Sequence, residues 1–349
     1  METKRNIREY HYTLAVVIPC WNCENYIRPL LDSICNQTFL DWNAFLVDDG
    51  CLDHAPEIIQ EYQKKDHRIH YAKRDSLPKG AQRCRNIGLR LSEGAEYVVF
   101  FDSDDIIAPY CFEQRVGFMQ DNSAVDFASF PTKAFKKDIY DDTYWGFGVP
   151  GRQELILSLL YWRTLQIFVS SNIYKRDRLI KADLNWDEKV SCMQDADFNI
   201  QSLTKGLTHS FAEPCRIDYF YRTGHSSVSK RIAEPSVFDS HLYLIGKVTD
   251  SFRHAFRTKY DFYLKAYIVN FLGLFKKDRM HVRSLLKLGF VKRHPIFFFQ
   301  IVLYLMLKMR GRTILFKRYT IYSNDSAQEW SSLVTDAIRR KSFSEINHG

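Results

Sequence analysis

At Tyr97-Val98-Val99-Phe100-Phe101-Asp102-Ser103-Asp104-Asp105, an apolar run leads directly into a cluster of three aspartates. An apolar run without alternating polar residues predicts a strand that is buried on both faces. Carboxylates packed together at the tip of such a strand are unfavourable unless a cation neutralises them, and oxygen ligands suit Mg²⁺ or Mn²⁺. The same residues also fit a surface acidic turn that caps the next helix. A cation site and a capping turn are therefore both open interpretations.

On both sides of this stretch, apolar runs alternate with segments of helical spacing. The apolar runs, which predict further strands, lie at residues 14–18, 44–47, 69–72, 127–130 and 167–174. The segments whose apolar residues recur at helical spacing lie near residues 26–34, 58–62, 82–92, 153–162 and 192–203. In the first half of the chain this alternation is typical of βαβ units. We therefore predict an α/β fold with a mostly parallel sheet flanked by helices.

Polar residues follow three of the predicted strands at the point where each ends. They are Pro19 to Asn22, Asp48-Asp49-Gly50 and Asp102 to Asp105. Ligands of such sheets bind beyond the carboxyl ends of the strands, so we expect the three groups to converge on one crevice. A carboxylate of the second group would accept hydrogen bonds from a nucleotide base or ribose, or would instead close a turn before Gly50.

Two further groups of charged residues are candidates for the same crevice. Lys79, Arg83 and Arg85 lie between the acidic clusters, and an arginine fork suits a diphosphate, although a solvated helix face is an equal alternative. The segment Gln194-Asp195-Ala196-Asp197-Phe198 opens a predicted helix. One of its carboxylates would serve as a general base, or would only favour the helix N-terminus.

Composition narrows the class of protein. The 349 residues are 46% hydrophobic and 26% charged, which excludes disordered, collagen-like and low-complexity chains. The formal net charge is +8, but residues 276–318 hold twelve Lys or Arg and one acid, a local balance of +11 that leaves −3 for the rest. Eight dilute cysteines and a polar N-terminus without an apolar signal-peptide core predict reduced, cytoplasmic thiols. Cys20 and Cys23 are expected as small core or turn residues rather than a redox pair or half of a zinc site.

Several segments of the chain, taken together in their sequence order, resemble the family 2 glycosyltransferases. These are nucleotide-sugar-dependent enzymes with a GT-A fold. The matching segments follow the order of the family's motifs and are Val16 to Pro19, Trp21 to Tyr26, Leu31 to Ile34 with Gln37-Thr38, Val47 to Gly50 with Asp53, Cys84 to Leu89, and Tyr97 to Asp105 with Pro109. The segments that resemble the later motifs are Asp195 to Phe198 and Tyr221-Arg222 with Ser226, Ser227 and Ser229. The resemblance covers residues 12–230.

The resemblance implies an inverting single displacement and a role for each matching residue. Asp102 and Asp104 would form the family's DxD motif and hold a divalent cation, Mn²⁺ or Mg²⁺, with Asp104 as the direct ligand. Asp195 would be the catalytic base. The residues expected to bind the donor nucleotide are Pro19, Cys20, Trp21, Glu24, Asp49, Lys79, Arg85, Asp102 and Ser103. Because Gln194 replaces the usual acidic neighbour of the base, the choice between Asp195 and Asp197 stays open.

The resemblance also implies the substrates. By this resemblance we expect the donor to be a nucleoside-diphosphate sugar, specifically a UDP-sugar. The expected acceptor is a hydroxyl group of a glycan or lipid-linked glycan in surface polysaccharide synthesis. Trp145, Trp162 and Trp186 are candidate stacking surfaces for the sugar or acceptor. One alternative is a sugar-phosphate nucleotidyltransferase, which should carry a glycine-rich, lysine-bearing loop where this chain has Pro19 to Asn22. The other is a non-catalytic protein that binds nucleotides or glycans.

We predict two domains, a catalytic domain at residues 1–235 and a helical, basic region at residues 236–349. The apolar stretch at residues 295–307 is shorter than the ~20 residues that span a bilayer, and cations flank it. It therefore predicts either a helix lying on the anionic inner face of the membrane or a helix packed on the catalytic domain. No nucleic-acid-binding motif accompanies these cations. The expected location is cytoplasmic and peripheral at the membrane, and the oligomeric state is not predicted.

Overall fold

The computed structural model describes residues 11–74, 77, 79–136, 144–145, 168–212, 215–224, 235–251, 291, 295–296, 298–299 and 302. These residues belong to two compact units. The first unit comprises Met1–Trp145, Ile167–Glu188 and Gln201–His225, and the second comprises Gly146–Gln166, Lys189–Ile200 and Ser226–Gly349. The division of the chain into domains at residue 235 stays a prediction.

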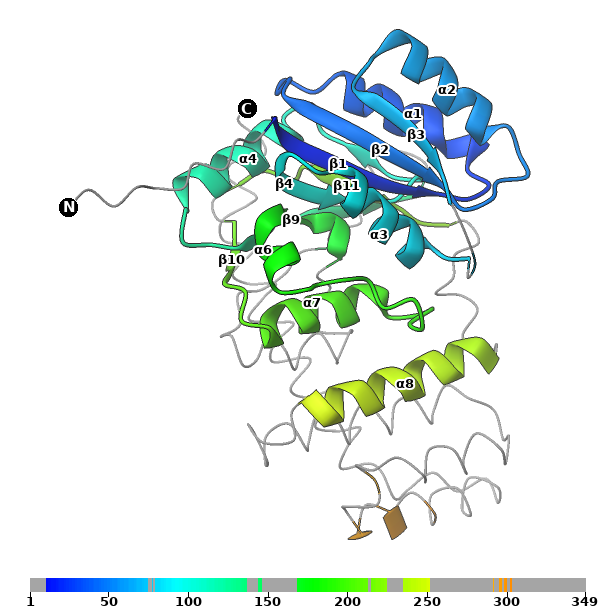
Figure 1. Ribbon diagram of the computed structural model, residues 1–349, viewed down its shortest axis with the longest axis vertical. Coiled ribbons are helices and arrows are strands. Elements are labelled where there is room, and N and C mark those ends of the chain that lie inside the picture. Colours follow the sequence, from blue (N-terminus) through cyan, green and yellow to red (C-terminus); the bar gives the residue numbers. More distant parts are fainter. Residues whose placement is uncertain are drawn as a thin grey trace, which may run out of the picture. The chain divides into compact units, whose positions relative to one another are not determined.

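The first unit is built on a seven-stranded sheet (Figure 1), whose strand order is β10-β6-β9-β4-β1-β2-β3. The strands are β1 (Tyr12–Cys20), β2 (Trp42–Asp48), β3 (Ile69–Lys73), β4 (Ala95–Phe100), β6 (Phe127–Ser129), β9 (Asn172–Lys175) and β10 (His209–Phe211). The four neighbouring strands β4, β1, β2 and β3 are parallel to one another, and β10 is parallel to β6. Strand β9 runs antiparallel to both of its neighbours, β4 and β6. The predicted mostly parallel α/β fold is confirmed.

Helices α1 (Glu24–Cys35), α2 (Ala55–Lys65) and α3 (Ala81–Leu91) connect the parallel strands β1, β2, β3 and β4, as the spacing of apolar residues predicts. Helices α4 (Cys111–Asp121) and α6 (Arg176–Lys181) also belong to this unit and were not predicted. Side chains of β1 alternate between the two faces of the sheet. Leu14, Val16 and Ile18 belong to one core cluster with apolar residues of α1, α2 and α4. On the opposite face Gly88 of α3 meets Val17, because an added Cβ would lie 2.2 Å from Val17 Cγ1.

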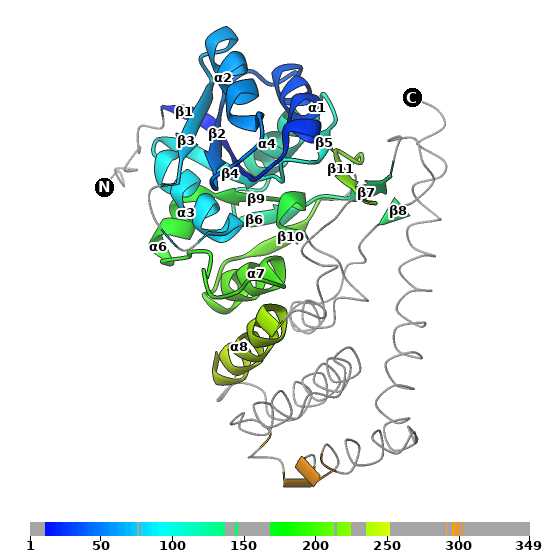
Figure 2. The same cartoon turned by 90° about the vertical axis from the view of Figure 1, so that its right-hand side faces the viewer.

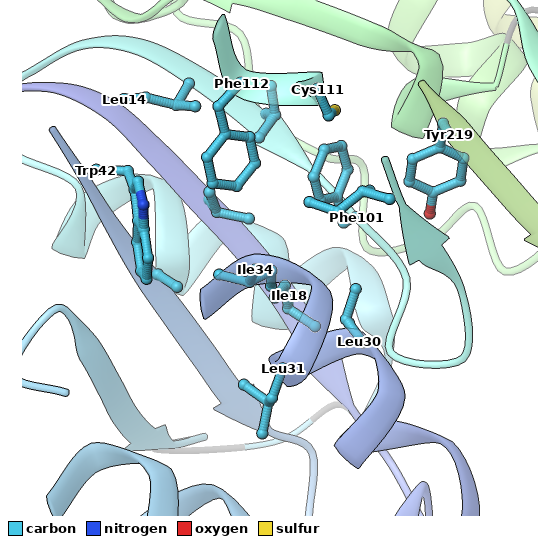
Figure 3. Packing of buried hydrophobic residues seen from close by; sticks show 14 of the residues in the cluster. Leu14, Ile18, Leu30, Leu31, Ile34, Trp42, Phe101, Cys111, Phe112 and Tyr219 are labelled. Atoms are coloured by element: carbon cyan, nitrogen blue, oxygen red, sulfur yellow. The ribbon is translucent and has the colours of Figure 1, made fainter. Parts of the chain in front are cut away.

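Phe101 belongs to this core and lies immediately before the acidic residues Asp102 to Asp105. Figure 3 shows its ring between those of Phe112 and Tyr219, with centroid distances of 6.4 Å and 5.0 Å. All three side chains are fully buried. The backbone N–H of Phe101 also donates to Val17 O on β1, at 3.0 Å. The acidic stretch therefore begins from a fixed point in the core.

A second, four-stranded sheet of this unit has the order β5-β11-β7-β8. Its strands are β5 (Ile106–Ile107), β7 (Thr132–Phe135), β8 (Tyr144–Trp145) and β11 (Tyr219–Arg222). Central strand β11 pairs antiparallel with β5, which follows the acidic stretch, and parallel with β7. This sheet was not predicted. The strand predicted at residues 167–174 is also corrected, since Val169–Ser171 form a 3-10 turn before β9.

The second unit contributes the start of α7 (Gln194–Thr204) and helix α8 (Pro235–Ser251). The helix predicted at residues 153–162 and most of the basic stretch at residues 276–318 lie outside the described residues. In the described part of the chain, no helix is both long enough and apolar enough to cross a bilayer.

Candidate active site

Three strand ends meet at one edge of the seven-stranded sheet, as the sequence predicts. Cys20 at the end of β1 is paired with Asp48 at the end of β2, and Asp49 N donates to Cys20 O at 2.8 Å. On the other side of β1, Val17 is paired with Phe100, the last residue of β4. The polar residues that follow these strands therefore start from neighbouring positions, and Figure 2 shows the strands side by side.

The acidic stretch divides into exposed and buried carboxylates. Asp102, Ser103 and Asp104 are half-buried, whereas Asp105 is fully buried. Burial is the main cause that raises the pKa of Asp105 well above its ordinary value, and the nearby charges of Asp104 and Asp102 raise it further. Asp102 and Asp104 are therefore the carboxylates of this loop that a ligand can reach, and Asp105 belongs to the scaffold.

Residues of β11 hold the acidic stretch from the second sheet. Tyr219 Oη donates to Asp105 Oδ2 at 2.5 Å and accepts from Asp102 N at 3.3 Å. Arg222 donates from its backbone N–H to Asp105 Oδ1 at 2.7 Å and from Nε to Asp104 O at 2.7 Å. Both carboxylate oxygens of Asp105 are thus satisfied, and the backbone at Asp102 and Asp104 is fixed.

Arg85 reaches the acidic stretch from α3. Its guanidinium forms an ion pair with Asp102, with Nη2 and Oδ1 2.5 Å apart, and lies over the Trp186 ring at 4.5 Å. Trp186 is only 2% exposed and is held through its backbone by Asn86. Trp186 is therefore a support for Arg85 rather than an open stacking surface. Trp162 lies outside the described residues.

The second acidic pair separates into two roles. Asp48 Oδ1 accepts from the backbone N–H groups of Gly50 and Cys51, and its Oδ2 accepts from Tyr71 Oη. Burial alone would raise the pKa of Asp48, but these hydrogen bonds outweigh burial and lower it. Asp48 therefore closes the turn.

Asp49 lies beside a basic loop. Its Oδ1 is 2.7 Å from Arg74 Nε and accepts from Gly80 N at 3.1 Å. Gly80 precedes α3 with a φ of 147°, a conformation that favours glycine, and the exposed Lys79 comes immediately before it. The structure thus brings Asp49 and Lys79 together next to the start of α3.

The remaining predicted donor residues lie between the end of β1 and the start of α1. Pro19 and Cys20 are buried in β1, whereas Trp21 is 51% exposed. Glu24 Oε2 accepts from His54 N at 3.0 Å, so this carboxylate supports the start of α2.

The cysteines near this strand end are free thiols. Cys20 and Cys23 are buried, as expected for core and turn residues. The hydrogen bond with Cys20 is the main cause that raises the pKa of the Cys23 thiol, and burial adds to it. A protonated thiol is a poor metal ligand and a poor nucleophile.

Asp195 and Asp197 lie in the second unit, at the start of α7. Asp195 is half-buried, whereas Asp197 is 3% exposed. Lys247 Nζ of α8 is 2.8 Å from Asp197 Oδ1 and 2.9 Å from its Oδ2. Lys247 thus occupies both carboxylate oxygens of the buried Asp197, whereas Asp195 is the more exposed carboxylate of the two.

The donor atoms of the acidic stretch suit a cation only together with a ligand. Among the described residues, no three His, Cys, Asp or Glu side chains are grouped to hold a metal ion. Mg²⁺-type ions are usually held by one or two carboxylates together with substrate phosphates and water. Asp102 and Asp104 supply that number of carboxylates, so the residues fit such a group.

Arg74 contacts Asp49, Tyr219 and Arg222 hold the acidic stretch, and Lys247 pairs with Asp197 within the second unit. None of these four contacts is predicted from the sequence. The sequence does place Tyr221-Arg222 in a motif, but their purpose depends on strand β11 pairing with β5. Such pairing of distant segments leaves no local pattern. The contacts that these four residues make are therefore known only from the structure.

Together, the parallel sheet, the carboxylates at its carboxyl edge and the accessory sheet define a GT-A-type α/β fold. The sequence profile of glycosyl transferase family 2 matches residues 15–178 of this chain.

Curated relatives include further biosynthetic proteins and glycosyltransferases, and solved structures share the fold. The chain is 27% identical over 282 residues to the minor teichoic acid biosynthesis protein GgaA of Bacillus subtilis, a match that covers 75% of this chain and 59% of GgaA. The structure of S. aureus TarS 1–349 in complex with UDP-GlcNAc is similar with a TM-score of 0.63 and 18% identity, over 94% of this chain and 92% of the TarS 1–349 chain. The mannosyltransferase PcManGT of Pyrobaculum calidifontis, in complex with GDP-Man and Mn²⁺, is similar with a TM-score of 0.51 and 14% identity, over 91% and 88%. The chain spans less than two thirds of the length of the curated relatives it matches.

Proposed function

We propose that the protein is an inverting glycosyltransferase that moves a sugar from a nucleoside-diphosphate donor to a hydroxyl group of a glycan or lipid-linked acceptor. The observation that carries this proposal is the pair of half-buried carboxylates, Asp102 and Asp104, on a loop held rigid by Tyr219 and Arg222. Rigidly placed carboxylates suit a diphosphate site because they can hold a divalent cation that also binds the phosphates. A uridine donor is proposed because TarS, which shares the fold, binds UDP-GlcNAc.

The donor residues divide by position. Asp49, beside Pro19, Cys20 and Trp21, is proposed to accept hydrogen bonds from the base, with Glu24 supporting this wall. Lys79 is exposed and free to approach the diphosphate. Arg85 acts through its ion pair, which orients Asp102 toward the donor, and Ser103 lies between the two reachable carboxylates.

A divalent cation, Mn²⁺ or Mg²⁺, is proposed at Asp104 with help from Asp102. PcManGT, a protein of the same fold, was solved with Mn²⁺. When bound, the cation would neutralise charge on the leaving diphosphate. The role of this chain's own residues is to hold the two carboxylates at a fixed separation, which the hydrogen bonds from β11 achieve.

Asp195 is proposed as the base. It would take the proton from the acceptor hydroxyl as that oxygen bonds to the anomeric carbon and the bond to the diphosphate breaks, so the configuration is inverted. The pairing of Asp197 with Lys247 favours Asp195 for this role over Asp197.

Membrane association is proposed for the basic C-terminal region. In the described part of this region, Ile296 is 75% exposed and Phe299 is 68% exposed. Apolar side chains among cations suit an anionic leaflet. Replacing Lys308, Arg310 and Arg312 by Glu should reduce co-sedimentation with phosphatidylglycerol vesicles, and unchanged co-sedimentation would contradict the proposal.

The proposed activity is tested by incubating the protein with a panel of nucleotide sugars. We expect release of the nucleoside diphosphate from one donor in the presence of Mn²⁺ and loss of release with EDTA. Release of pyrophosphate from a sugar phosphate and a nucleoside triphosphate would instead indicate a nucleotidyltransferase. Donor binding without any release, even with acceptor glycans present, would indicate a non-catalytic binding protein.

A further inference from the structure

Helix α8 makes two polar contacts with the segment that carries Asp195, and all residues of both contacts belong to the second unit. Upstream of Asp195, Ser240 Oγ accepts from Cys192 N at 3.0 Å and donates to Cys192 O at 3.2 Å. Downstream, Lys247 Nζ pairs with both carboxylate oxygens of Asp197. Figure 2 shows α8 beside the start of α7. Asp195 therefore lies between Cys192 and Asp197, which are both held by side chains of α8.

Both contacts are largely buried, and the Lys247 side chain is 24% exposed. Ser240 and Asp197 are 2% and 3% exposed, and the neighbouring His241 is 6% exposed with Nε2 3.7 Å from Cys192 Sγ. Water cannot readily replace a hydrogen bond or ion pair in such a position, so removal of one partner leaves the other unsatisfied. These buried contacts therefore restrain the backbone of the segment that carries Asp195.

The restrained segment contains a strained residue. Met193 has a φ of 61°, which lies in the left-handed region that side-chain-bearing residues rarely adopt. Its carbonyl oxygen accepts from Asp197 N at 3.0 Å and so closes the first turn of α7. Strained backbone of this kind persists only where surrounding contacts hold it, and α8 holds Cys192 immediately before Met193 and Asp197 four residues after it.

Helical geometry then determines how these contacts act on Asp195. Residues two apart on a helix point to different sides, so the Asp197 side chain that is held by α8 and the Asp195 side chain leave α7 in different directions. The anchors can thus fix the position of Asp195 without covering its carboxylate, which is only half-buried.

We propose that Ser240 and Lys247 of α8 are positioning residues for Asp195, and that α8 is therefore part of the catalytic apparatus. The inference rests on the proposed role of Asp195 as the base. It gives the first helix of the C-terminal region a purpose that is separate from membrane binding.

The test compares Ser240→Ala and Lys247→Met with Asp239→Asn, a change at an exposed position of the same helix. We expect the first two to lower kcat by about 10- to 100-fold while donor KM and UDP affinity stay unchanged, since misplacement of a base costs rate rather than binding. Asp239→Asn should behave as wild type. Unchanged kcat in both anchor variants, or equal losses in kcat and UDP affinity, would overturn the inference.

A second set of variants separates this inference from the proposed function. If Asp195→Asn keeps full activity, the proposed base is wrong. If Asp195→Asn abolishes transfer, Ser240→Ala added to it should lower the residual rate no further, because both act through one group. A further additive loss would contradict positioning. If Lys247→Met fails to fold, two other variants replace it in the test. Lys247→Arg should retain kcat, whereas the double variant Lys247→Met with Asp197→Leu should lose it.

Discussion

Tyr219 connects the second sheet to the acidic stretch through a single hydroxyl group. The Oη atom donates to the buried Asp105 and accepts from the backbone of Asp102. No local pattern around Tyr219 predicts this contact, because the two partners are more than a hundred positions away along the chain. By contrast, the acidic stretch itself could be predicted, since an apolar run that ends in carboxylates is visible in the sequence.

Tyr219→Phe tests the support of this loop. Loss of the hydroxyl leaves buried Asp105 without one of its two donors, so we expect the free energy of unfolding to fall by about 1–3 kcal/mol. Donor KM should rise at the same time. Urea unfolding and steady-state kinetics give both values.

The matched control is Tyr62→Phe, which removes an exposed hydrogen bond to Asp32. Water can replace that bond, so the unfolding free energy should change by less than about 0.5 kcal/mol. Equal effects in the two variants would show that the Tyr219 hydroxyl has no special role.

At the scale of elements, α3 carries Arg85 to Asp102 and is itself fixed by close contact with β1. The contact requires Gly88, since an added Cβ would lie 2.2 Å from Val17 Cγ1 and within 3.2 Å of two further Val17 atoms. A side chain there must push α3 away from the sheet. The position of Arg85 therefore depends on a glycine that lies one turn further along the helix.

Gly88→Ala should lower the free energy of unfolding by about 1–3 kcal/mol, the usual cost of overpacking a core. Adding Val17→Ala should restore part of this loss by making room. Gly117→Ala on α4 is the control, because no atom lies within 4 Å of the added Cβ, and it should stabilise the protein by about 0.5–1 kcal/mol through helix propensity. A neutral Gly88→Ala in thermal and urea unfolding would contradict the packing of α3 on β1.

The elements that could be predicted are those whose pattern is long enough to recognise. The strands β1 and β4 and the helices α1 and α3 follow directly from apolar runs and helical spacing. Strands β5 and β8 have two residues each and β11 has four, so their existence depends on pairing across the fold rather than on local preference. The second sheet therefore lies beyond what the sequence alone predicts.

At the scale of the whole molecule, the position of the charged residues along the chain says more about their role than the net charge does. The excess of cations belongs to residues 276–318, and the remainder of the chain is slightly acidic. In the catalytic part, individual cations are used in defined pairs, such as Arg115 with Asp218, whose side chains are fully buried. The sequence predicts the imbalance between the two parts, but the buried pairs need the fold.

Whole-molecule stability should depend on pH through His209. Burial lowers the pKa of His209 from 6.5 to about 3. Between these values the unfolded chain binds a proton that the folded chain excludes, so the free energy of unfolding falls as the pH drops from 6.5 toward 3. One such histidine contributes a slope of up to about 1.4 kcal/mol per pH unit.

His209→Gln should therefore reduce the pH dependence of unfolding by about 1 kcal/mol per unit between pH 4 and pH 6. Glutamine can keep the hydrogen bond that joins His209 Nε2 to Ser129 Oγ at 2.8 Å. Urea unfolding across this pH range measures the slope. The control, His54→Gln at an exposed position, should leave it unchanged, and an unaltered slope in His209→Gln would show that this residue is not the cause.

The measurement that tests the central claim most directly is the rate of nucleoside diphosphate release from the preferred nucleotide sugar, in Mn²⁺, for Asp104→Asn beside Asp121→Asn. Asp104 lies in the half-buried acidic stretch, whereas Asp121 is exposed at the end of α4. We predict that Asp104→Asn loses at least about 100-fold in rate, as expected when charge stabilisation of a leaving group is removed, and that Asp121→Asn matches the wild type. Full activity of Asp104→Asn would contradict the assignment of this acidic stretch as the centre of a metal-dependent glycosyltransferase.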